Sequence, residues 1–203
     1  MQYPQHIQYL TQRYSRLQGL KGFPLGLLLL LVVLWVNFTS GPSRNLAFPI
    51  AFGLGSAGLY WLIARYYRTH YGRVEGTLQQ KRTDYFSSAL AGLAGLAAFI
   101  IDISYALPFS TVGLVFAAGC VMEYMRLYRL GRSPYYLWQM LISFGLILTV
   151  SIFPLLGAKD LWLDIGLRSH LLLVLAVTSI VLLITSVWEH LNFVRQFPFK
   201  EPK

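Results

Sequence analysis

The chain has 203 residues, of which 56% are hydrophobic and only 12% are charged, and its formal net charge is +9. A soluble domain carries about 25% charged residues, so this chain lacks the polar side chains that would cover a water-exposed surface. The positive charge does not indicate nucleic-acid binding, because the basic residues lie in short connections between apolar stretches rather than together on one soluble face. The composition predicts an all-α, polytopic integral membrane protein in contact with the lipid bilayer.

The first segment, residues 1–21, has the spacing of an amphipathic helix. Ile7, Leu10, Tyr14 and Leu17 fall on one helical face, and glutamines and arginines fill most of the rest. This pattern favours a helix that lies on the cytoplasmic surface of the membrane. A frayed polar tail is the alternative.

Six apolar stretches follow, each near the ~20 residues that a helix needs to cross a bilayer. The stretch from Tyr85 to Met125 is too long for one span, and the segment from Tyr105 to Pro108 divides it. We therefore expect a six-helix transmembrane domain over residues 22–192 and a tail over residues 193–203. The predicted spans are residues 23–40, 47–67, 85–105, 108–127, 134–156 and 169–191.

The first span could also be read as a cleaved signal peptide, because it combines a basic flank with a leucine-rich centre. Asn37 to Ser40 offers no small-x-small cleavage site, so we expect this span to be retained.

Basic residues set the predicted orientation. Of the 17 lysines and arginines, all but Arg44, Lys159 and Arg168 lie in the N-terminal segment, in the tail, or in the connections after the second and fourth spans and the span ends beside them. The positive-inside rule then places both termini in the cytoplasm, and we expect the cytoplasmic membrane of a bacterium. Aromatic residues near the span ends, among them Trp138 and Trp188, are typical of an interfacial belt.

Small residues in three spans predict close helix packing, since they let helix backbones approach one another in lipid. We expect the second, third and fourth spans to form the tight centre and the leucine-rich first and sixth spans to face lipid. Some of these small-residue faces could instead serve a partner or a homodimer. The packing residues are Gly53, Gly58, Gly92, Gly95, Gly113 and Ala117.

Ionisable side chains within spans are candidate functional groups, because charge is costly in hydrocarbon. Glu123, Glu189 and His190 lie at similar depth near the cytoplasmic ends of the fourth and sixth spans. If these spans are neighbours, the three residues and Gln139 could form a polar cluster that moves a proton or binds a cation. Asp102, near the outer end of the third span, is the second candidate. For each ionisable group the alternative is an interfacial charge with a local partner.

No motif in the chain identifies a reaction. The sequence lacks His-Glu-x-x-His, Gly-x-Ser-x-Gly and the P-loop pattern. Gly53 to Gly58 reads Gly-x-Gly-x-x-Gly, but it lies in an apolar span with no preceding strand. His170 and His190 are at opposite membrane faces, which excludes a haem shared between them. We therefore expect a protein without catalytic residues, metal or cofactor.

The sequence favours a non-catalytic membrane protein, a subunit or accessory component of a larger or homo-oligomeric assembly. Its partner would be another copy, a second membrane protein or an ATPase. The alternative is a small transporter of an ion or metabolite that uses the cytoplasm-facing cluster of Glu123, Glu189 and His190.

Overall fold

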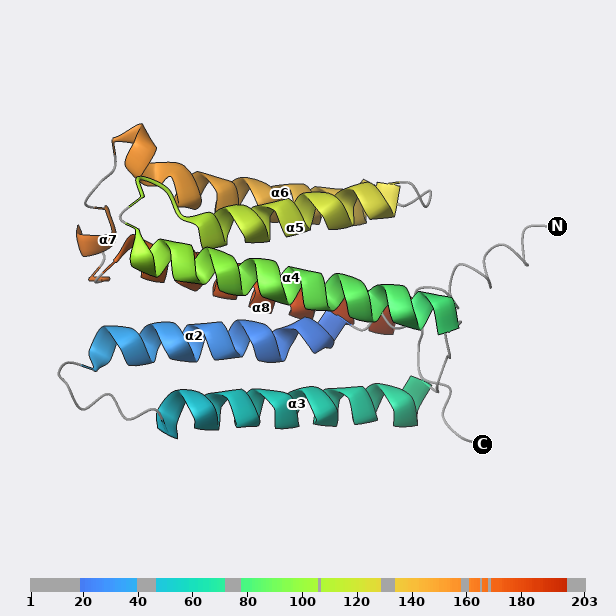
Figure 1. Ribbon diagram of the computed structural model, residues 1–203. Helices are drawn as coiled ribbons and strands as arrows, with labels where there is room; N and C mark the ends of the chain where they lie inside the picture. The colour runs from blue at the N-terminus through green and yellow to red at the C-terminus, as the bar shows by residue number, and fades with distance from the viewer. Residues whose placement is uncertain are drawn as a thin grey trace, which may run out of the picture.

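A computed structural model describes most of the chain between Gly19 and Gln196 (Figure 1). The described residues are 19–39, 47–71, 78–105, 107–128, 134–157, 161–164, 166–167 and 169–196. The predicted amphipathic helix, up to residue 18, and the tail from residue 197 lie outside these residues. So do Arg44, Lys159 and Arg168, the basic residues expected on the outer side.

Every element within the described residues is helical. The described residues form six helices of 16 or more residues. Successive long helices run in opposite directions (Figure 1). The elements are η1 (Gly19–Gly22), α2 (Phe23–Phe38), α3 (Ala47–Tyr71), α4 (Leu78–Ser104), α5 (Thr111–Tyr128), α6 (Pro134–Ile152), η2 (Phe153–Leu156), α7 (Leu161–Asp164) and α8 (His170–Gln196).

Five of the described helical segments are long and apolar enough to cross a membrane. They are Gly19–Phe38, Ala47–Tyr71, Tyr85–Ser104, Trp138–Leu156 and His170–Arg195. The apolar part of α5 is shorter, Thr111–Met125. The architecture is that of a helical membrane protein, as the composition predicts.

The centre of the bundle differs from the one expected from the small residues. In the most apolar 18-residue stretch of α8, 44% of the residues are buried, whereas the buried shares of the corresponding stretches of α3 and α4 are 0% and 6%. The expectation that the second and third spans lie at the centre and the sixth faces lipid is therefore wrong. The physical reason is that α8 buries small polar side chains, Thr178, Ser179 and Ser186, against neighbouring helices.

Glycines at the start of the described chain allow α8 to approach η1 and α2 closely. A Cβ atom at Gly22 would lie 2.7 Å from the Ser186 hydroxyl, and one at Gly26 would lie 3.0 Å from Leu183 Cγ. The Ser179 hydroxyl donates a 2.9 Å hydrogen bond to the Gly26 carbonyl. Small residues and serine hydroxyls are what hold helices together in lipid, where the hydrophobic effect does not drive their association.

Two helix pairs flank this centre. On one side, α5 packs along α6, and the Ser110 amide donates a 2.9 Å hydrogen bond to the Ser151 carbonyl. On the other side, α3 packs along α2, where the Ser56 hydroxyl donates to the Pro24 carbonyl at 2.9 Å. Buried residues of α2, α4, α5 and α8 meet in one apolar cluster: Val33, Ala98, Val112, Leu172 and Leu175.

Candidate functional site

An aromatic cluster joins α3 to α8 at the end of the bundle where the described chain begins. Tyr67 of α3 has no exposed surface, and its hydroxyl oxygen lies 2.8 Å from Nδ1 of His190 on α8. The Tyr67 and His190 rings meet edge to face, with centroids 5.8 Å apart. Tyr71 and Phe193 pack edge to face at 4.8 Å beside them. These contacts give the imidazole a fixed position between two helices.

Glu189 lies beside this cluster, at the contact between η1 and α8. A Cβ atom at Gly19 would overlap the Cβ of Glu189 and would lie 2.9 Å from the Ser186 carbonyl oxygen. The glutamate is half-buried and directly precedes His190, which contacts Tyr67. Tyr67, which the sequence analysis does not single out, therefore joins α3 to the part of α8 that carries Glu189 and His190.

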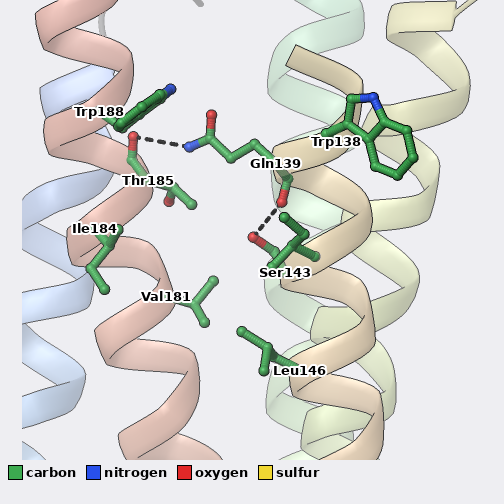
Figure 2. A pocket seen from close by; sticks show the side chains of 9 residues that line it. Trp138, Gln139, Ser143, Leu146, Val181, Ile184, Thr185 and Trp188 are labelled. Atoms are coloured by element: carbon green, nitrogen blue, oxygen red, sulfur yellow. Dashed lines mark hydrogen bonds between the residues drawn. The ribbon is translucent and has the colours of Figure 1, made fainter. Parts of the chain in front are cut away.

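Gln139 approaches α8 from another helix, α6. Its side-chain amide nitrogen lies 3.4 Å from the Thr185 carbonyl oxygen, and the Ser143 hydroxyl donates to the Gln139 backbone carbonyl at 2.8 Å (Figure 2). The 3.4 Å separation is long for a hydrogen bond, so this contact between the helices is weak. A groove of about 380 Å³ lies between α6 and α8 at this level.

His190 and Thr185, the residue that Gln139 contacts, lie on different sides of α8. Residues 185 and 190 are five positions apart, which corresponds to about 140° around a helix with 3.6 residues per turn. His190 meets α3 there, whereas Gln139 comes from α6. Glu123 is half-buried on α5. That Glu123, Glu189, His190 and Gln139 form one cluster stays a prediction.

Asp102 has a local structural role at the start of α5. Its carboxylate accepts hydrogen bonds from the backbone amides of Thr111 and Val112 at 2.7 and 3.1 Å, and from the Ser110 hydroxyl at 2.6 Å. The Thr111 hydroxyl also contacts the carboxylate. A carboxylate on the first amides of a helix satisfies otherwise unpaired donors and interacts favourably with the helix dipole. These contacts match the alternative given for Asp102, in which an interfacial charge is paired with a local partner.

The predicted packing residues fall into two groups. Gly113 is buried, and a Cβ atom there would overlap the Ser151 hydroxyl and lie 2.8 Å from Val174 Cγ1; Ala117 is 1% exposed. By contrast, a Cβ atom would meet nothing within 4 Å at Gly53, Gly58, Gly92 or Gly95. The second group therefore makes no close approach to another described helix.

Within the described residues, no group of three or more His, Cys, Asp or Glu side chains could hold a metal ion. Comparison with family models, with curated proteins and with solved structures finds no match for this chain. The functional conclusion therefore depends on the chain's own geometry.

Proposed function

We propose that this protein is a non-catalytic membrane subunit that assembles in the bilayer with a second copy or another membrane protein. The observation that carries the proposal is a small-residue face of α3 that no described helix covers. Ala51, Gly55 and Gly58 recur at spacings of four and three residues, so they share one side of the helix. All three are exposed, and a Cβ atom at either glycine would meet nothing within 4 Å.

This face points away from the rest of the bundle. Ser56 marks the side of α3 that meets α2, through its hydrogen bond to Pro24. Gly58 is two positions further along, about 200° around the helix. Exposed small residues in a lipid-facing helix favour association, because they allow another helix backbone to approach closely.

The proposed topology has six spans, with α5 as the fourth, and both chain ends on the cytoplasmic side. Alternating helix directions and the contact of Gly19 with α8 next to Glu189 support it (Figure 1). Basic residues lie at the end of the bundle where Gly19 meets α8: Lys21, Arg65, Arg68 and Arg195. The positive-inside rule expects such residues at cytoplasmic ends.

Cysteine cross-linking in intact membranes tests the association. Cys120 is the only cysteine, so Cys120→Ala gives a background in which Gly58→Cys can form a disulfide between two copies. Gly119→Cys is the matched control, because Gly119 is an exposed glycine on α5 that also has nothing within 4 Å of a Cβ atom. We expect oxidation to yield a dimer from the Gly58→Cys protein and none from the control.

A photoreactive side chain at position 58 extends the test to a different partner protein, which would appear as a larger adduct. In both formats a second substitution on the same face, Gly55→Leu, leaves the probe at position 58 in place and should weaken the association by about tenfold. Overpacking typically costs about 1–3 kcal/mol, and a tenfold change is about 1.4 kcal/mol. A chain that forms no adduct through position 58 with either probe would show that the proposed interface is wrong.

A further inference from the structure

The α6–α8 pair is closely packed at one end and open at the other. At the outer end, Val150 packs against Leu173 and Val174, and His170 Nε2 lies 2.7 Å from the Val150 carbonyl oxygen. Towards the other end, a groove of about 380 Å³ separates the two helices. This volume is within the range of about 300–1,000 Å³ that small-molecule sites occupy.

The groove changes in polarity along its length (Figure 2). One end holds Trp138, Trp188 and the Gln139 amide, and the other end holds Leu146 and Val181. The two tryptophan residues are 65% and 54% exposed, and amphipathic rings favour such exposed positions at the headgroup level of a membrane. The groove is thus polar at its interfacial end and apolar further along, as a phospholipid is polar at its headgroup and apolar along its acyl chains.

The length of the groove matches one leaflet. Trp138 and Leu146 are eight residues apart on α6, a rise of ~12 Å at 1.5 Å per residue. Half of a hydrocarbon core of about 30 Å is ~15 Å. A transmembrane helix would need a groove through both leaflets, and the contact of Val150 with Leu173 and Val174 closes the second half. The occupant that fits is therefore a chain from a single leaflet.

We propose that this groove is a binding site for one acyl chain of a bilayer phospholipid, in the leaflet on the side of Trp138 and Trp188. The walls at Ile142 and Ile184 are apolar, so hydrocarbon rather than water fills the space. The Gln139 amide carries two N–H donors, and one can bind the lipid's ester carbonyl while the other faces Thr185. This site lies on helices other than α3, so it does not depend on the proposed association.

Native mass spectrometry of the detergent-purified chain tests the site. The unaltered chain should retain one phospholipid, because the groove surrounds the acyl chain more fully than a flat helix surface does. Leu146→Trp or Ile184→Trp adds bulk to the groove at an exposed side chain and should reduce the retained phospholipid by about tenfold. Leu141→Trp is the matched control, since Leu141 is exposed on α6 and does not line the groove, and it should retain the lipid.

A second measurement uses the two groove tryptophans and does not depend on any filling variant. With Trp35, Trp61 and Trp162 changed to Phe, only Trp138 and Trp188 emit. After reconstitution with acyl-brominated phosphatidylglycerol and dilution into detergent free of this lipid, emission should stay quenched. Full recovery of tryptophan emission would overturn the proposal, and so would equal lipid retention in all variants. A dimer that only the filling variants abolish would also overturn it, because it would show that a second copy occupies the groove.

Discussion

The Tyr67 hydroxyl lies 2.8 Å from Nδ1 of His190, and this contact joins the C-terminal end of α3 to α8. Tyr67 is the buried residue of α3, whose other described residues are half-buried or exposed, so this tyrosine is the main anchor of the helix to α8. A peripheral helix in lipid depends strongly on such polar contacts, because apolar burial distinguishes poorly between lipid and protein.

Tyr67→Phe should destabilise the protein by about 1–2 kcal/mol, since it removes one hydrogen bond and leaves the histidine nitrogen without that partner. Thermal unfolding in detergent, followed by circular dichroism, measures the change. Tyr60→Phe is the control, because Tyr60 is 48% exposed on the same helix. Equal melting temperatures for the two variants would show that the contact with His190 contributes little.

Asp102→Ala should cost about 2 kcal/mol, because it leaves the first amides of α5 without their capping acceptor. Asp102→Asn should cost less, since one oxygen remains to accept a hydrogen bond from the Thr111 or Val112 amide. Unfolding midpoints of the two variants test this order. Asp164→Asn, an exposed change in α7, should leave the midpoint unaltered.

Gly113→Ala should destabilise the protein by about 1–3 kcal/mol through overpacking between α5, α6 and α8. The added methyl group would overlap the Ser151 hydroxyl and lie 2.8 Å from Val174. Gly119→Ala on the same helix has open space at the corresponding atom and should be neutral or slightly stabilising. A neutral Gly113→Ala would mean that α5 and α6 are further apart than described.

Reporter proteins fused to the two chain ends should report from the same compartment, because an even number of spans returns the chain to the side on which it began. Alkaline phosphatase and green fluorescent protein fusions distinguish the outer from the cytoplasmic side. We expect fluorescence and no phosphatase activity at both ends, as the distribution of basic residues requires. Signals from opposite compartments would exclude six spans.

The sequence predicts the helices well because span length and apolar composition are local properties. The arrangement of the helices is harder to predict from the sequence, because a small residue favours close packing but does not identify the helix that packs against it. Gly113 meets Ser151, whereas Gly58 meets no other helix among the described residues, and the two look alike in the sequence. The glycines at positions 19, 22 and 26 precede a leucine-rich run, which concealed their role against α8.

The site residues show the same limit. Asp102 is recognisable as a costly charge, but its partners lie eight to ten positions away, across a bend. A Ser-Thr pair after Pro108 was the available signal of a capped helix. The α6–α8 groove results from two helices that contact at one end only, which no local pattern predicts. Its tryptophans, Trp138 and Trp188, had the sequence signature of an interfacial belt alone.

The hydrogen bond from Ser179 to Gly26 joins residues 153 positions apart, between the first and the last long helix. During synthesis, α2 emerges before any of the residues against which its glycines pack. The newly made chain must therefore hold α2 in lipid with its packing surface uncovered until α8 is inserted. Translation that stops before His170 leaves that surface exposed to membrane chaperones and proteases, so incomplete chains should be degraded while finished ones persist.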